Sequence, residues 1–319
     1  MKRLQNRIAE SRTALPWTVL LTAAVWTAVC ALADDTTSAI GTGRYIIMAL
    51  LTAVACWQTA LLNTHYALMR TFSRMPACSL LVLTVCSLSV FGRETVEGLL
   101  TTCLMLGCYH HLFATFQDKQ AIGHTFTAFA LLSVAALFTP YVLLFVPLLW
   151  ILLATSLMAF SPRSLVASLL GLALPCWLML PLYLLRQPSI PERLIPPVSE
   201  QLMPLADISQ WQPEEATTIS FVALLFLLGT LNFLYTSHHE SIKTRMLFRV
   251  FITTGILTLL LILVQPQRLS LLLPLLIAQT APLIAHFITF TNSRLTNLMF
   301  IAMLTTAALL TALSLWKIS

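Results

Sequence analysis

Long runs without a charged residue recur along this chain and constrain its fold more than any other feature. The segments between Arg12 and Asp34 and between Arg268 and Arg294 contain no Asp, Glu, Lys or Arg. Charged residues make up 9% of the chain and hydrophobic residues 58%, whereas a typical soluble domain is about 25% charged. A soluble fold could not hide so much apolar surface, because its exterior must still present polar atoms to water.

The runs predict an all-α fold, a polytopic transmembrane helix bundle. A spanning helix needs about 20 apolar residues, so about eleven spans fit, with short loops and a single integral membrane domain over residues 1–319. The expected spans are residues 15–33, 45–69, 77–91, 99–116, 126–139, 141–160, 165–185, 219–237, 250–264, 269–290 and 295–316.

Two features leave the number of spans open. The apolar run 126–160 contains Thr139-Pro140 near its middle. Proline lacks a backbone donor and disfavours helix in the residue before it, so we expect a tight hairpin there. A single kinked helix would give ten spans and invert everything downstream. The basic start and the Ala31-Leu32-Ala33 sequence before Asp34 also resemble a cleavable signal peptide, and its removal would leave ten spans in the same orientation.

The distribution of Lys and Arg predicts the orientation, because cytoplasmic flanks are enriched in both. With the N-terminus in the cytoplasm, nine of the twelve acidic residues fall outside. Most basic residues then fall inside, namely Lys2, Arg3, Arg7, Arg12, Arg70, Arg74, Lys119, Arg163, Lys243, Arg245, Arg249 and Arg294. This pattern predicts a multi-pass membrane protein with a cytoplasmic N-terminus. The net charge of +6 is scattered over loops, so we expect no nucleic-acid partner.

One predicted outer loop is large and rich in proline. Residues 186–218 contain Pro188, Pro191, Pro196, Pro197, Pro204 and Pro213. Such a density of proline favours an extended, stiff backbone. Within the loop, the apolar residues Leu202, Met203, Leu205, Ile208 and Trp211 suggest a short element on the membrane surface, with Trp211 at headgroup depth.

Cysteines and histidines do not indicate a metal site or a cofactor. The seven cysteines, Cys30, Cys56, Cys78, Cys86, Cys103, Cys108 and Cys176, form no C-x-x-C pair and are expected to be packing residues without disulfides. All seven histidines fall on the predicted cytoplasmic side: His65, His110, His111, His124, His238, His239 and His286. His110 and His111 are adjacent on a helix and point about 100° apart, and no zinc spacing is present. We therefore expect the histidines to lie at the inner membrane interface, each with a polar partner; a metal site or an inner polar pocket is the alternative.

The expected spans contain no ionisable Asp, Glu, Lys or Arg. Ion-coupled transporters and proton pumps usually keep such a group near the midplane, so this absence argues against both classes. The deepest polar groups are Gln58 and Gln279, which we interpret first as interhelical hydrogen-bond partners. A permease or flippase without a midplane charge remains an alternative and would need a polar path past these two residues.

The outer face contains the candidate site. Asp34 and Asp35 follow the first span and are the candidate catalytic residues, because an acidic pair can act as a general base or hold a divalent cation. Arg93, Gln267 and Arg268 are the candidate substrate-binding residues, since an arginine at the outer mouth suits a phosphate. The simpler interpretation is that short hydrophilic loops tolerate acids on the outside.

Two resemblances accompany these residues. The stretches "ALLSVAALFTPYVLLFVPLLWILL", "SPRSLVASLLGLALP" and "RLSLLLPLLIAQTAPLIAHFI" resemble a family of uncharacterised bacterial multi-span inner-membrane proteins. Asp34 or Asp35, with Arg268 before "LSLLLP", is similar to the C-type glycosyltransferase superfamily, whose members take sugar from a polyprenyl-phosphate donor on the outer face. The first outer loop, residues 34–44, is much shorter than is usual in that superfamily.

The resulting hypothesis is a cell-envelope protein that handles a lipid-linked or phosphate-bearing substrate at the outer leaflet, as a reduced glycosyltransferase-like protein. The alternatives are the permease or flippase above and a non-catalytic membrane subunit of an envelope complex. The lipid bilayer is the expected partner of the helices. At the outer face, the side chain of Asp34 or Asp35 is expected to lie close to that of Arg268.

Overall fold

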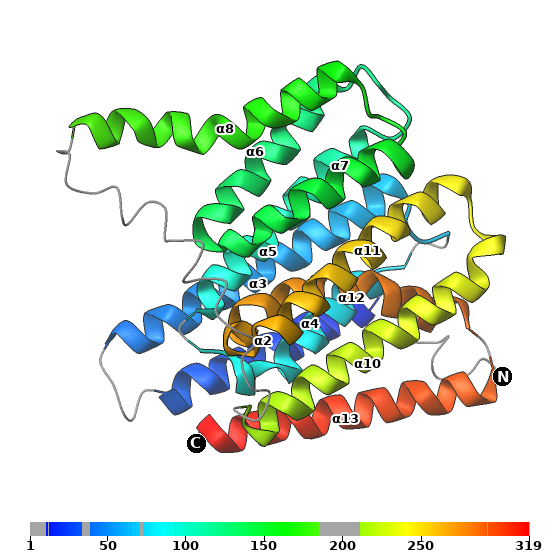
Figure 1. Ribbon diagram of the computed structural model, residues 1–319. Helices are drawn as coiled ribbons and strands as arrows, with labels where there is room; N and C mark the ends of the chain where they lie inside the picture. The colour runs from blue at the N-terminus through cyan, green and yellow to red at the C-terminus, as the bar shows by residue number, and fades with distance from the viewer. Residues whose placement is uncertain are drawn as a thin grey trace.

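The computed structural model describes residues 11, 13–33, 39–70, 73–92, 94–185, 211–291 and 293–318, and every regular element among them is helical (Figure 1). The α-helices are α2 (Ala14–Ala33), α3 (Ala39–Tyr66), α4 (Met75–Cys86), α5 (Thr95–Ala114), α6 (Ile122–Phe138), α7 (Phe145–Thr155), α8 (Pro162–Leu185), α10 (Pro213–Thr236), α11 (Ile242–Val264), α12 (Leu269–Phe290) and α13 (Arg294–Ile318). Short 3-10 turns are η1 (Leu88–Val90), η2 (Pro140–Leu144), η4 (Ser237–His239) and η5 (Pro266–Arg268).

Helix α12 forms the centre of the bundle. It is surrounded by α4, α5, α10 and α11, and its residues from Leu271 to Ile288 are all buried. Two isolated glycines allow the close packing. A Cβ atom at Gly98 of α5 would overlap the carbonyl oxygen of Leu271, and one at Gly229 of α10 would lie 2.9 Å from the Cβ of Leu283. Neither glycine belongs to a G-x-x-x-G pair, so that motif does not mark these close helix contacts.

The predicted break at Thr139-Pro140 is confirmed. Helix α6 ends at Phe138, and the chain turns through η2 into α7, which runs back alongside α6 (Figure 1). The backbone N–H of Gln117, ahead of α6, donates a 2.8 Å hydrogen bond to the carbonyl of Leu157, beyond α7. Phe129 and Trp150 stack across the hairpin with ring centroids 6.5 Å apart. A single kinked helix over residues 126–160 would keep these pairs apart, so that alternative is wrong.

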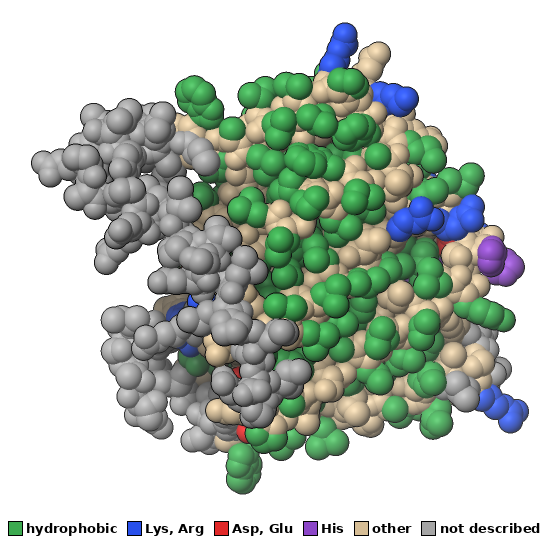
Figure 2. All heavy atoms as spheres, in the orientation of Figure 1, with side chains coloured by type: hydrophobic (Ala, Val, Ile, Leu, Met, Phe, Trp, Pro, Cys, Tyr) green, Lys and Arg blue, Asp and Glu red, His purple; other side chains and the backbone are tan. Residues whose placement is uncertain are grey.

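The loops gather at two ends of the bundle. One, the basic end, contains the described parts of the loops α3–α4, α5–α6, α7–α8, α10–α11 and α12–α13, with nearby basic residues including Arg70, Lys119, Arg163 and Lys243. The other, the Trp211 end, contains Trp211 and the loops α4–α5 and α11–α12, with Glu94, Glu97, Glu214 and Glu215 nearby. In Figure 2, Lys, Arg and His side chains stand mainly at the right and upper right margins of the molecule. Hydrophobic side chains cover most of the described face that is turned toward the viewer.

Two predicted boundaries were wrong because capping extends the helices. Helix α11 begins at Ile242 and not at residue 250, since the Ser241 side chain caps it by accepting a hydrogen bond from Thr244 N. Helix α10 begins at Pro213, inside the predicted outer loop 186–218. Proline is favoured in the first turn of a helix, and Gln212 and Glu215 form a capping box there. Residues 186–210 of that loop lie outside the described residues.

Six helices are long and apolar enough to cross a membrane, within the described part of the chain. They correspond to α2, α3, α10, α11, α12 and α13. Shorter apolar helices include α4, whose 12 residues cover about 18 Å against the ~30 Å of a bilayer core. Helices α2 and α13 leave most of their surface uncovered by protein, including Trp17, Leu20, Leu309 and Trp316. These apolar helices fit a membrane protein.

Candidate functional site

Arg268 lies at the Trp211 end, where η5 leads into α12. It is the N-cap residue of α12 and forms an ion pair with Glu94, the N-cap residue of α5. The two side chains are 46% and 36% exposed. An exposed pair of this kind contributes about 0–1 kcal/mol, because water screens it. A ligand with a stronger negative charge can therefore compete with Glu94 for the guanidinium.

A pocket of about 340 Å³ adjoins this ion pair. Polar groups from Gln267, Glu215 and Ser270 line it together with apolar atoms of Val90, Gly92, Trp211, Pro266 and Leu269. The indole N–H of Trp211 donates a 3.0 Å hydrogen bond to the carbonyl of Pro266, which holds the ring against η5. Glu215 accepts a 3.2 Å hydrogen bond from Gln212 N, so its carboxylate also caps the N-terminus of α10.

Charges of both signs surround the pocket, because Arg268 stands beside it and the Glu215 carboxylate is part of its lining. The N–H group of Leu269 donates to the Pro266 carbonyl, and the helix dipole places positive potential at this end of α12. Arg268 adds a full charge beside Gln267 and Ser270. Trp211, Val90 and Leu269 offer apolar surface next to these polar groups. Phosphate attached to a hydrocarbon chain has this combination of properties.

The structure describes only part of the predicted outer site. Gln267 and Arg268 are both exposed; Gln267 lines the pocket, and Arg268 lies between two residues that line it. Asp34, Asp35 and Arg93 lie outside the described residues. Gly92 and Glu94, from the connection between α4 and α5, lie close to Gln267, Arg268 and Ser270 at the start of α12, and the role of Gly92, Glu94 and Ser270 was not predicted. Trp211 was predicted to lie at headgroup depth on the outer side, although it was not predicted as a site residue.

Gln279, one of the two deepest polar residues, braces three helices in the middle of the bundle. Its Nε2 donates a 3.1 Å hydrogen bond to the Tyr109 hydroxyl of α5, and its Oε1 accepts a 2.8 Å bond from Thr258 Oγ1 of α11. All three side chains are wholly buried. The interpretation of Gln279 as an interhelical hydrogen-bond partner is therefore confirmed. Gln58 differs, since its Oε1 is buried without a hydrogen-bond partner among the described residues.

A second polar group joins three segments at the basic end. Glu240, which is buried, lies 3.2 Å from Nε of Arg70 and 3.5 Å from Nε2 of His286. The ring of His286 is enclosed by Phe233, Phe248 and Phe290. This cluster ties the loops α3–α4 and α10–α11 to the last turns of α12 and is structural in character.

The seven histidines all lie at the basic end, and His110 and His111 face different histidines on neighbouring helices. His110 faces His65, with ring centroids 5.4 Å apart, and His111 Nδ1 lies 3.2 Å from His124 Nδ1. Within the described part of the chain, no three His, Cys, Asp or Glu side chains converge as a metal site would require. Cys56, Cys78, Cys86, Cys103 and Cys108 are free thiols.

Comparison of this chain with protein-family models, curated proteins and solved structures finds no match.

Proposed function

We propose that this chain is a polytopic protein of a bacterial cytoplasmic membrane that binds a lipid-linked or phosphate-bearing substrate at the outer leaflet. In this proposal the N-terminus and the basic end face the cytoplasm, the Trp211 end faces outward, and about eleven segments cross the membrane or its core. Support for the orientation comes from the gathering of Lys and Arg at one end and of Glu at the other.

The observation that carries the proposal is the position of Arg268. It stands at the start of α12, beside a 340 Å³ pocket that combines polar and apolar lining. On binding, the phosphate would replace Glu94 on the guanidinium and accept a hydrogen bond from the side-chain amide of Gln267. The apolar tail would leave along Trp211 and Leu269 toward the bilayer.

Catalysis is a further element of the proposal and depends on Asp34 and Asp35. Either carboxylate, acting as a general base beside the bound phosphate, would make the protein a reduced glycosyltransferase-like enzyme. Without such a carboxylate the same pocket would serve a binding subunit of an envelope complex. A permease has less support, because the polar atoms of Gln279 are already bonded to Tyr109 and Thr258.

The binding test uses the full-length protein in lipid nanodiscs with a polyprenyl phosphate and the matching polyprenol as probes. We expect the phosphate to bind at least tenfold more tightly, and Arg268→Gln to remove most of that difference, because charge-assisted hydrogen bonds contribute about 1.5–3 kcal/mol. Arg163→Gln, at the basic end, is the matched control. Equal affinity for phosphate and alcohol in the unmodified protein would refute the proposal.

The catalytic element has a separate test. In Asp34→Asn, Asp35→Asn and the double variant, phosphate binding should persist while turnover of a polyprenyl-phosphate sugar is lost. Turnover that survives the double variant would leave the binding proposal standing and remove these two residues from any catalytic role.

A further inference from the structure

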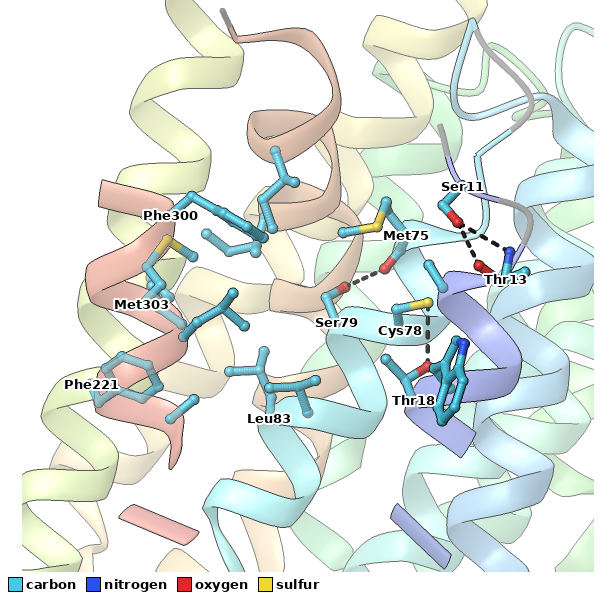
Figure 3. A pocket seen from close by; sticks show the side chains of 18 residues that line it. Ser11, Thr13, Thr18, Met75, Cys78, Ser79, Leu83, Phe221, Phe300 and Met303 are labelled. Carbon is cyan, nitrogen blue, oxygen red and sulfur yellow. Dashed lines mark hydrogen bonds between the residues drawn. The ribbon is translucent and has the colours of Figure 1, made fainter. Parts of the chain in front are cut away.

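A large apolar cavity opens between α2 and α13, and most of its lining residues lie nearer the basic end, although Phe221 of α10 lies nearer the Trp211 end. Its volume is about 430 Å³, within the ~300–1,000 Å³ typical of ligand sites. Figure 3 shows Phe300 and Met303 of α13 and Phe221 of α10 on one side and Thr18 of α2 on the other, with α4 between them. The proposed outer site does not use this cavity.

The polar atoms that line the cavity are satisfied within the protein. Ser79 Oγ lies 2.9 Å from both the Met75 and Ala281 carbonyl oxygens, and Thr18 Oγ1 donates a 2.9 Å hydrogen bond to the Leu15 carbonyl. What remains on the cavity surface is almost entirely side-chain hydrocarbon and thioether from Leu, Ile, Val, Phe and Met. A polar solute entering it would lose hydrogen bonds to water without replacing them, whereas a hydrocarbon chain would not.

The position of the cavity matches one leaflet. Its lining on α4 extends from Met75 to Leu83, a rise of about 12 Å, against ~15 Å for half of a bilayer core. Trp17 and Leu304, at its edge, are 70% and 40% exposed. They belong to α2 and α13, both long enough to cross a membrane and both mostly uncovered by protein. The cavity therefore opens sideways toward the surface that contacts lipid.

Basic side chains stand where the cavity meets the basic end. Arg74 caps α4 immediately before Met75, and Arg294 begins α13 about two turns before Phe300; both are exposed. Ser11 and Thr13, whose hydroxyls are 2.7 Å apart, lie at the same edge (Figure 3). From this arrangement we infer that the cavity binds an acyl chain of an anionic phospholipid from the leaflet at the basic end, with its phosphate near Arg74 and Arg294.

Photochemical labelling tests the chain site. The full-length protein is placed in nanodiscs that contain phosphatidylglycerol with a diazirine in one acyl chain, and the adducts are mapped by mass spectrometry. We expect adducts on residues 75–83 and 300–307. Val82→Trp, which fills the cavity, should reduce them several-fold, whereas Val166→Trp, on the exposed face of α8, should leave them unchanged. Leu304→Trp at the edge is a second blocking variant, should Val82→Trp not fold.

Several outcomes would overturn the inference. One is labelling of residues 75–83 that persists unchanged in a folded blocking variant. Another is a cross-link from a diazirine amino acid at position 82 to a protein segment or a second copy, in place of lipid. For the headgroup, phosphatidylcholine should label less than phosphatidylglycerol, and the double variant Arg74→Gln, Arg294→Gln should abolish that preference. Equal labelling by both lipids in the unmodified protein would contradict the anionic specificity.

Discussion

The side-chain amide of Gln279 donates a 3.1 Å hydrogen bond to the hydroxyl of Tyr109, 170 residues earlier in the chain, at a point where both side chains are wholly buried. With Thr258 on the other atom of the amide, this contact links α5, α11 and α12. A hydrogen bond in the apolar interior has no water to replace it, so it selects one rotational setting of α12 against its neighbours.

Tyr109→Phe should destabilise the folded protein by about 0.5–1.7 kcal/mol, the range measured for hydrogen bonds between membrane helices. The loss arises because the Gln279 amide is left without its acceptor. Thermal unfolding in detergent, followed by the fluorescence of an added thiol-reactive dye, measures the shift. Tyr235→Phe on the exposed face of α10 is the control. Identical midpoints for the two variants would contradict the bracing role of Gln279.

Gly98→Ala should lower stability by about 1–3 kcal/mol, because the added methyl group overlaps the Leu271 carbonyl and forces α5 away from α12. The control is Gly123→Ala, where a Cβ meets no atom within 4 Å. That replacement lies in the first turn of α6 and should be neutral or stabilising by less than about 1 kcal/mol, through helix propensity alone. The comparison separates packing from propensity, and equal effects at the two positions would argue against the close contact of α5 with α12.

Glu94→Gln should strengthen binding of a phosphate-bearing lipid in the nanodisc assay, up to about fivefold. The reason is that a bound phosphate no longer has to displace a carboxylate from Arg268, an exchange worth at most about 1 kcal/mol for an exposed pair. Glu97→Gln, in the first turn of α5 and exposed, is the control for net charge. Weaker binding in Glu94→Gln than in Glu97→Gln would indicate that Glu94 itself contacts the ligand.

Reporter fusions check the orientation. Fusions within residues 117–121, 156–161 and 237–241 should all report the cytoplasm, because these loops lie together at the basic end. A reporter inserted near residue 266 should respond as an exported one. If the first three fusions all reported an exported location, the proposed orientation would be inverted and the Arg268 pocket would lie on the cytoplasmic face.

The sequence alone determined the helical architecture and several boundaries. Apolar character belongs to each residue, so uncharged runs predicted spans without knowledge of their neighbours; α12 begins and ends at the predicted residues 269 and 290. The break after Phe138 was also predictable, because proline acts on the residue beside it. Local capping at Ser241 and Gln212 was present in the sequence as well, although the predicted boundaries missed it.

The tertiary structure alone decided which residues meet. Arg268 was a predicted site residue, but its pairing with Glu94 depends on the packing of α5 against α12. The same packing makes Gly98 a contact point and brings Tyr109 to Gln279. The cavity between α2, α4 and α13 is a mismatch of shape among helices far apart in the chain. Hydrophobicity drives a helix into the bilayer but does not select its packing partners, because lipid tails are as apolar as leucine. The partners are selected by van der Waals fit and interhelical hydrogen bonds, which exist only in the assembled bundle.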